Sequence, residues 1–246
     1  MPSHAVLIET DWAERDLAAG RALMAAVHAR AAQLGARSLE HTVDCPPVAP
    51  QYQEHADARI RLLHSCGYEL LRDGLRWLAT APRAHEGGPL RFRSLPEVGE
   101  AAFVDAIAAT LQGTPDTELQ RDVEERGAHD AARDYLLDHQ SLEHRPEWFE
   151  LAYAADGTLA GVIMGARNPT SAVIAYVGVV PEHRGRGLAA PLVRRGTARL
   201  VAGGATEIRG DCDRANVAMA KAFERAGYER FARRRSFRRD IAPAEA

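Results

Sequence analysis

The fold is decided by the stretch Val173-Ile174-Ala175-Tyr176-Val177-Gly178-Val179-Val180-Pro181-Glu182-His183-Arg184-Gly185-Arg186-Gly187-Leu188-Ala189. Residues 173–180 are β-branched or apolar almost without interruption, which is typical of a strand buried on both faces. Pro181 ends this strand because proline has no N–H to donate to a ladder. Apolar residues recur at helical spacing from Leu188 onward, so the stretch predicts a strand, a basic glycine turn and a helix.

The turn between the strand and the helix has the features of an anion site. Gly185 and Gly187 allow the main chain to approach a bulky oxyanion, and the first N–H groups of the helix point toward it. Arg184 and Arg186 add positive charge around the same turn. A diphosphate suits this combination of donors and charge.

Two blocks in this part of the chain resemble motifs of the GCN5-related N-acetyltransferases (GNAT family). The first is the pyrophosphate-binding motif R/Q-x-x-G-x-G/A, read here as Arg184-x-x-Gly187-x-Ala189. The second is a short strand over residues 205–210 followed by a helix over 217–225. In the family, an Asn at the start of that helix contacts the pantetheine arm or nearby backbone, and Asn216 occupies this position. Its alternative role is that of an ordinary helix cap.

The resemblance implies an α/β fold (α+β in some schemes), with a mixed, mostly antiparallel sheet flanked by helices. It covers residues 90–240 and implies acetyl-CoA as cosubstrate, with helices expected over 96–111 and 115–139. The strand before the turn would supply a backbone N–H to the oxyanion and pair with the pantetheine arm. We expect the cofactor-binding residues to be Val177, Gly178, Val179, Arg184, Gly185, Arg186, Gly187, Leu188, Ala189, Ala190, Asn216 and Phe223.

The chain departs from the family at the acid that protonates the leaving thiolate. Many members have a Tyr seven residues after the helix Asn, and Phe223 stands there and has no proton to donate. Either another group protonates the thiolate, or water does, or the domain is not a competent acetyltransferase. The other groups considered are Tyr176, Cys212 and Tyr228, although Tyr228 is better explained as a core aromatic residue.

The base that deprotonates the acceptor amine is not fixed by spacing. A chain of water molecules could also do this work. The side-chain candidates are Glu150, Asp211, Asp213, His129 and Asp130. The catalytic set that we expect is Tyr176, Glu150 and Asp213.

The N-terminal part of the chain has a pattern similar to that of the C-terminal part. Residues 61–69 align with residues 221–229, each position shifted by 160, and both helices end in Gly-Tyr-Glu. We therefore predict that residues 1–80 are a second, incomplete copy containing only the C-terminal half of the fold; two unrelated segments are the alternative. Its turn, residues 10–18, has no glycine and three carboxylates, which would repel a diphosphate.

The predicted domain organisation follows from this repeat. Residues 1–80 form the degenerate copy that does not bind coenzyme A, residues 81–89 are a linker rich in Pro and Gly, and residues 90–246 form the catalytic domain. The final basic segment, expected as a hairpin, contains Arg230, Arg233, Arg234, Arg235, Arg238 and Arg239. A solvated strand face explains it better than an acidic ligand does.

Composition limits the class of protein. The 246 residues carry a net charge of -3, which argues against a general nucleic-acid binder. No apolar run approaches the ~20 residues of a membrane span, and the N-terminus lacks a signal-peptide pattern, so we expect a cytoplasmic protein. No disulfide framework is expected, and no metal either, since Cys45, His55, His64 and Cys66 fit no standard zinc spacing.

Together these features predict transfer of an acetyl group to a primary amine of a small molecule, by direct attack in a ternary complex. The alternatives are a protein N-acetyltransferase and a non-catalytic acyl-CoA-binding or sensor protein. The sequence leaves open the acceptor, the acyl chain length and whether the chain forms a homodimer.

Overall fold

The computed structural model describes residues 4–7, 10, 12, 16–49, 52–82, 88 and 90–241. The chain divides into two compact units: unit 1 contains Met1–Gly74 and Ala232–Ala246, and unit 2 contains Leu75–Phe231. These boundaries differ from the predicted ones, because residues 75–80 belong to unit 2 and residues 232–241 to unit 1. The cause is a pair of twelve-residue strands, β3 (Glu69–Thr80) and β9 (Glu229–Asp240), that each have residues in both units. Residues 83–87 and 89 of the predicted linker lie outside the described residues.

Unit 1 places two helices beside a small sheet. Its other elements are β1 (His4–Leu7), α1 (Leu17–Gln33), β2 (Ser38–Cys45) and α2 (Ala56–Ser65). The strand order is β1-β2-β9-β3, with β1 and β2 parallel and β9 antiparallel to β2. Its buried core consists of Met24, Leu39, Val43, Leu62, Leu63, Tyr68 and Phe237.

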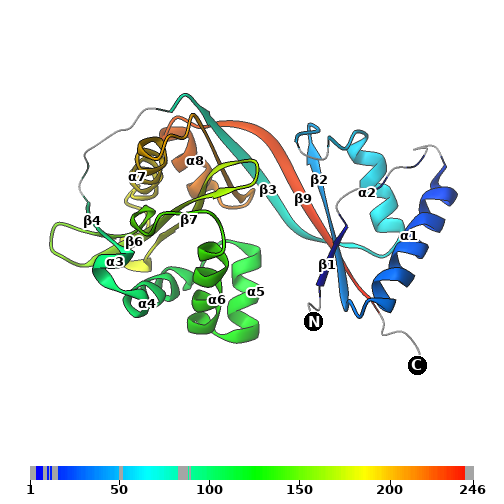
Figure 1. Ribbon diagram of the computed structural model, residues 1–246, viewed down its shortest axis with the longest axis horizontal. Coiled ribbons are helices and arrows are strands. Elements are labelled where there is room, and N and C mark those ends of the chain that lie inside the picture. The colour runs from blue at the N-terminus through cyan, green and yellow to red at the C-terminus, as the bar shows by residue number, and fades with distance from the viewer. Residues whose placement is uncertain are drawn as a thin grey trace. The chain divides into compact units, whose positions relative to one another are not determined.

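Unit 2 is a mixed sheet with helices on two sides (Figure 1). Its elements are β4 (Arg91–Ser94), α3 (Leu95–Val98), α4 (Glu100–Leu111), α5 (Thr117–Arg126), α6 (Ala128–Gln140), β5 (Phe149–Tyr153), β6 (Leu159–Asn168), β7 (Ser171–Val179), α7 (Ala189–Ala202), β8 (Glu207–Asp213) and α8 (Val217–Arg225). The strand order is β3-β8-β7-β6-β5-β4. The pairs from β4 to β7 are antiparallel and β7 is parallel to β8, which confirms the predicted mixed, mostly antiparallel sheet.

The helices before β5 differ from the sequence prediction. A single helix was expected over 96–111 and another over 115–139, and each is two helices instead. Gly99 and Gly127 make the breaks, with φ of +80° and +82°. These are left-handed conformations that end a helix and that glycine adopts without a steric penalty.

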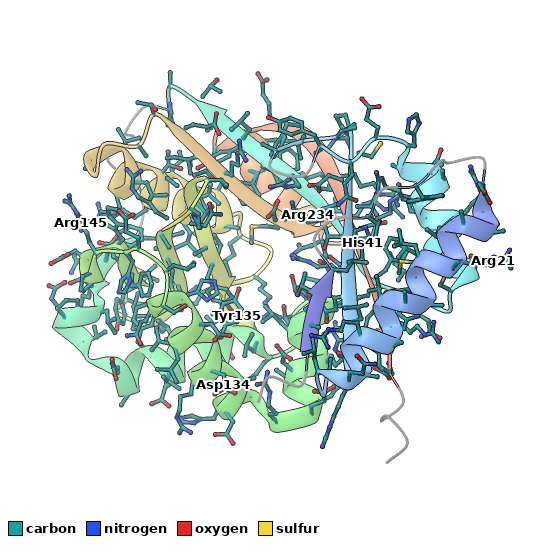
Figure 2. The ribbon with its side chains drawn as sticks, turned by 45° about the vertical axis from the view of Figure 1, so that its right-hand side comes forward. Arg21, His41, Asp134, Tyr135, Arg145 and Arg234 are labelled. Atoms are coloured by element: carbon teal, nitrogen blue, oxygen red, sulfur yellow. The ribbon has the colours of Figure 1, made fainter. Side chains whose placement is uncertain are left out.

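The final basic segment is one strand rather than the expected hairpin. Residues 229–240 contain no glycine, proline or asparagine to form a turn. Arg234 pairs with Asp44 at 2.8 and 2.9 Å within unit 1, so part of this positive charge is neutralised. Figure 2 labels Arg234 together with His41 of β2.

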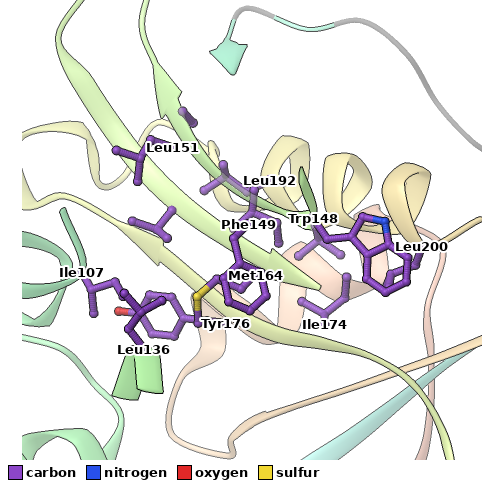
Figure 3. Close-up of a cluster of buried hydrophobic side chains, with 14 of the residues drawn as sticks. Ile107, Leu136, Trp148, Phe149, Leu151, Met164, Ile174, Tyr176, Leu192 and Leu200 are labelled. Atoms are coloured by element: carbon purple, nitrogen blue, oxygen red, sulfur yellow. The ribbon is translucent and has the colours of Figure 1, made fainter. Parts of the chain in front are cut away.

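The core of unit 2 fills both faces of β6 and β7. Tyr176 and Met164 are drawn beside Ile107 and Leu136 in Figure 3, while Ile174 lies toward Leu200 of α7. All of these side chains are less than 9% exposed. Among the described residues, no helix has the length and apolar character needed to cross a membrane.

Candidate functional site

The predicted anion turn is formed as the sequence suggests. Gly185 and Gly187 have φ of +75° and +76°, which glycine adopts more readily than any other residue. Both glycines are exposed, and α7 begins two residues after Gly187, at Ala189. No side chain caps the start of α7. The first N–H groups of this helix are therefore available to an anion.

Arg184 has a different role from the one that its place in the motif suggests. Its guanidinium donates to three backbone carbonyls: Val179 at 3.0 Å, Gly113 at 3.1 Å and Thr110 at 2.9 Å. These bonds fasten the end of β7 to the end of α4. Arg184 thus holds the turn in place, and its donors are directed at the protein rather than at a phosphate.

Two other arginines are closer to the open side of the turn. Arg186 is exposed, and one of its terminal nitrogens lies 3.4 Å from Nδ1 of His183. Arg225, at the end of α8, has a terminal nitrogen 3.7 Å from the point that a Cβ on Gly187 would occupy. Arg225 was not among the residues predicted for the site, and its only signal in the sequence is that it is a basic residue in the last turn of α8.

The strand before the turn has an unpaired edge. β7 pairs with β6 along its whole length, but it pairs with β8 only at Ala172 and Val173. Within the described residues, the edge from Ile174 to Val179 has no ladder partner on the β8 side. This edge includes the predicted residues Val177, Gly178 and Val179.

A β-bulge interrupts β7 at Ala175. Met164 of β6 faces Tyr176 and Gly165 faces Ile174, so Ala175 is an extra residue in β7. A bulge changes the direction of the backbone groups beside it, and this bulge lies on the unpaired edge of β7. Nothing in the sequence pattern located it.

Tyr176 is buried against α4. Thr110 donates its hydroxyl hydrogen to the carbonyl of Ile107 at 2.7 Å, so the hydroxyl of Tyr176, at 2.6 Å, is the donor to Thr110. Burial raises the pKa of Tyr176 to about 12. The phenol therefore keeps its proton at neutral pH, and that proton is directed at Thr110.

Glu150 and Asp213 are engaged in structural contacts. Both oxygens of Glu150, which is 1% exposed, accept from Arg195 at 2.7 and 2.8 Å and from Arg199 at 2.6 Å. Asp213 accepts from the backbone N–H of Thr117 at 2.8 Å and from its hydroxyl at 2.5 Å, so it fixes the start of α5. This geometry does not favour either carboxylate as a base.

The remaining bases named from the sequence have charged partners of their own. Asp211 lies 3.4 Å from Arg76, His129 lies 3.3 Å from Asp105, and Asp130 lies 3.1 Å from Arg133. Asp211 lies on β8, whereas His129 and Asp130 are neighbours in the first turn of α6 and both contact Arg133. None of the described contacts joins any of the three to Tyr176.

The block after β8 is a packing element. Asn216 accepts from the N–H of Met219 at 3.1 Å and caps α8, which is the alternative given for it above. Phe223 is buried and stacks on Trp77 with the ring centroids 5.8 Å apart. Trp77 also donates to the sulfur of Cys212 at 3.3 Å. The hydroxyl of Tyr228 bonds to Thr197 at 2.7 Å, in keeping with a core aromatic residue.

Comparison with known proteins relates part of the chain to one family. Residues 115–228 match the model of the acetyltransferase (GNAT) family. An acetyltransferase of Sodalis glossinidius (strain morsitans) is 36% identical over 94 residues, which are 37% of this chain and 63% of that protein. The chain thus spans less than two thirds of the length of the curated relatives that it matches first.

Solved structures are similar over most of the chain. A GCN5-related N-acetyltransferase from Sphaerobacter thermophilus superposes with a TM-score of 0.62 at 20% identity, covering 94% of this chain and 70% of that one. A tandem GNAT protein from the clavulanic acid biosynthesis pathway gives a TM-score of 0.57 at 16% identity, covering 92% and 70%. The fold is that of the GNAT acetyltransferases.

Proposed function

We propose that this protein is an acetyl-CoA-dependent N-acetyltransferase that acetylates a primary amine of a small molecule. The observation that carries the proposal is the combination, within unit 2, of an uncapped helix start just after Gly187 with an unpaired edge on the strand before it. The similarity of residues 115–228 to the acetyltransferase family supports the same activity.

The turn suits the diphosphate of coenzyme A. The backbone N–H groups at the start of α7 supply donors, the helix dipole favours an anion, and Arg186 and Arg225 add charge. Arg184 contributes by holding the turn against α4.

The unpaired edge of β7 suits the pantetheine arm. Its amides can pair with backbone groups as an added strand does. Five residues of extended chain, from Val180 back to Ala175, cover about 16 Å. A pantetheine arm of about this length that follows the edge from the turn therefore brings its thioester to the bulge.

The bound thioester supplies an activated acetyl group. In a ternary complex the amine nitrogen bonds to the carbonyl carbon, the carbon–sulfur bond breaks, and the thiolate takes a proton. In this proposal, backbone N–H groups of residues 177–179 donate to the oxyanion and stabilise it. Tyr176 remains our candidate for the proton donor: burial keeps its phenol protonated beside the bulge, and its hydroxyl has to rotate away from Thr110 to donate to the thiolate.

We infer further that residues 1–80 are an incomplete copy of the same fold. The order β1-α1-β2-α2-β3 matches β7-α7-β8-α8-β9, and the first two strands of each set are parallel. The N–H of Tyr68 bonds to the carbonyl of Leu63 at 3.0 Å, as that of Tyr228 does to Phe223 at 3.0 Å.

This copy is not expected to bind coenzyme A. The side chain of Asp16 accepts from the N–H of Ala19 at 2.9 Å and so caps α1, where α7 is uncapped. The carboxylate therefore occupies the helix start that a diphosphate would need. Residues 11 and 13–15 of the predicted turn lie outside the described residues.

The test is binding of acetyl-CoA, measured by calorimetry. Gly187→Glu adds a carboxylate and a side chain at the turn and should weaken binding by ~100-fold or more. Gly204→Glu is the matched control, because Gly204 also has a positive φ (+87°), has open space around its Cβ and follows the opposite end of α7. An equal loss of acetyl-CoA affinity in the two variants, or no binding of acetyl-CoA by the wild type, would refute the proposed site.

The rival functions give different results in a second assay. Release of free coenzyme A thiol with small amines supports the proposal. Release only with peptides indicates a protein N-acetyltransferase, and binding without release indicates a binding or sensor protein.

A further inference from the structure

A buried histidine lies between the β5–β6 hairpin and the predicted anion turn. His183 is the last residue of a short 3-10 helix, Pro181–His183, and is 7% exposed. One ring nitrogen, Nε2, lies 3.0 Å from the hydroxyl oxygen of Thr158 in the hairpin. The other ring nitrogen, Nδ1, lies 3.4 Å from a terminal nitrogen of Arg186 in the turn. The ring therefore connects the hairpin to the turn.

The hairpin determines which ring nitrogen carries the hydrogen. Thr158 donates to one oxygen of Asp156 through its N–H at 3.0 Å and through its hydroxyl at 2.7 Å. These two bonds lower the pKa of Asp156, so its carboxylate is charged and only accepts. The single hydrogen of the Thr158 hydroxyl is therefore used, and its oxygen accepts from Nε2 of His183.

The contact with Arg186 agrees with this assignment. A guanidinium has donors and no acceptor, so Nδ1 of His183 holds the lone pair that faces Arg186. A ring protonated on both nitrogens would instead place an N–H against the arginine. Arg186 thus donates to His183, His183 donates to Thr158, and Thr158 donates to Asp156. The neutral ring with its hydrogen on Nε2 satisfies all three contacts.

Arg186 keeps donors for a ligand while it is bonded to His183. A guanidinium has several N–H groups, and the contact with His183 uses only one of them. Arg186 is exposed, so its other N–H groups remain accessible. Arg184 differs, because it donates to three backbone carbonyls. The contact with His183 therefore restrains Arg186 without consuming its capacity to bind an anion.

We propose that His183 is a positioning residue that holds the guanidinium of Arg186 at the turn before the coenzyme binds. A flexible arginine side chain loses rotamer freedom when it binds a phosphate, and this loss lowers affinity. A side chain that His183 already restrains loses less. The ligand is the diphosphate of coenzyme A, so this inference rests on the proposed function. It adds that the β5–β6 hairpin supports the coenzyme site through Thr158 and Asp156.

A double-mutant cycle tests the inference, with acetyl-CoA affinity measured by calorimetry. His183→Leu removes the acceptor for Arg186 and should weaken binding about threefold. In the Arg186→Met background the same substitution should change affinity by less than about 1.5-fold, because the side chain on which His183 acts is absent. If His183 only packs beneath the turn, the two losses multiply, and the inference is wrong.

Arg225→Met is the matched control for Arg186→Met in this cycle. Arg225 is also an exposed arginine near Gly187, and no contact among the described residues joins it to His183. Its effect and that of His183→Leu should therefore multiply. His183→Asn is the conservative variant, because its amide oxygen can accept from Arg186 in place of Nδ1. It should bind acetyl-CoA within about 1.5-fold of the wild type. An affinity as low as that of His183→Leu would contradict the assigned contact.

The hairpin provides a second test, away from the turn. Thr158→Val removes the hydroxyl that bonds to Nε2 of His183 and should weaken acetyl-CoA binding about twofold. Thr170→Val is the matched control, because Thr170 donates to one oxygen of Asn168 in the same way, through its N–H and its hydroxyl at 2.9 Å each. None of the described contacts joins Thr170 to a histidine. The control should keep the wild-type affinity, and an equal loss in both variants would contradict the role of the hairpin.

Nitrogen NMR of the histidine-labelled protein gives a measurement that needs no coenzyme. At mildly alkaline pH, His183 should carry a hydrogen on Nε2 and none on Nδ1, with His183→Leu identifying its signals. A hydrogen on Nδ1 would overturn the inference. If the wild type does not bind acetyl-CoA, the proposed function and this inference fall together. If the wild type binds and the cycle shows no coupling between His183 and Arg186, only this inference is wrong.

Discussion

Arg233 and Asp73 form a bidentate ion pair in unit 1, with nitrogen–oxygen distances of 2.6 and 2.7 Å. They stand 160 residues apart. The same offset relates residues 61–69 to residues 221–229. The contact thus joins matching positions of β3 and β9, as expected if the two strands end two related segments.

This pair should stabilise unit 1 modestly. In a double-mutant cycle with Asp73→Asn and Arg233→Gln, we expect a coupling free energy of about 1 kcal/mol, limited by the 40% exposure of the Arg233 side chain. Urea unfolding of the four proteins measures it. The pair Arg238 and Asp240 is the control, since the Asp240 side chain is 83% exposed and its coupling should be smaller. Equal coupling in both cycles would contradict the prediction.

Substitution of Arg184 should mainly lower stability, whereas substitution of Arg186 should mainly weaken acetyl-CoA binding. Arg184→Met leaves three backbone carbonyls without their donor and should cost roughly 1 to 3 kcal/mol of unfolding free energy. Arg186→Met should leave stability unchanged and weaken acetyl-CoA binding about fivefold, equivalent to about 1 kcal/mol, less so at high salt. Thermal unfolding and calorimetry on both variants distinguish them. If instead Arg184→Met weakens acetyl-CoA binding and Arg186→Met lowers stability, Arg184 is the phosphate ligand.

The parts that the sequence predicted well are those set by local chemistry. Glycines at 185 and 187 require backbone conformations that few other residues adopt, so the turn and the start of α7 could be placed within two residues. The antiparallel pairing of β5 with β6 is of the kind that an Asp-Gly turn between two apolar runs predicts. Such signals do not depend on distant parts of the chain.

The parts that could not be predicted depend on tertiary contacts. Glu150 could be a base or half of an ion pair, and only the approach of α7, with Arg195 and Arg199, distinguishes the two. The bulge at Ala175 of β7 is a second example, because no sequence pattern located it. Residue type alone therefore indicated which groups can move protons, but not which of them meet at one point.

The contact between β7 and α4 should tolerate no extra carbon at Gly178. A Cβ there would lie 2.6 Å from both Cβ and Oγ1 of Thr110, so Gly178→Ala should cost roughly 1 to 3 kcal/mol of unfolding free energy. The second variant Thr110→Gly should relieve the clash, whereas Thr110→Ala, which keeps the Cβ, should not. Urea unfolding of the double variants tests this, and rescue by Thr110→Ala would disprove the assigned contact.

Tyr176 should give the protein an alkaline transition. Its folded-state pKa, about 12, lies above the value of 10.0 expected in the unfolded chain. The resulting stabilisation is fully present below pH 10 and is lost as pH rises through 12, with a total of roughly 2 to 3 kcal/mol. Tyr176→Phe should therefore flatten the fall in unfolding free energy between pH 10 and 12, while costing about 1 kcal/mol at pH 7 through the lost hydrogen bond to Thr110. Urea unfolding at a series of pH values provides the measurement. Tyr52→Phe, which alters a tyrosine that is 65% exposed, should keep the wild-type curve, and a Tyr176→Phe curve parallel to that of the wild type would show that the phenol ionises freely in the folded state.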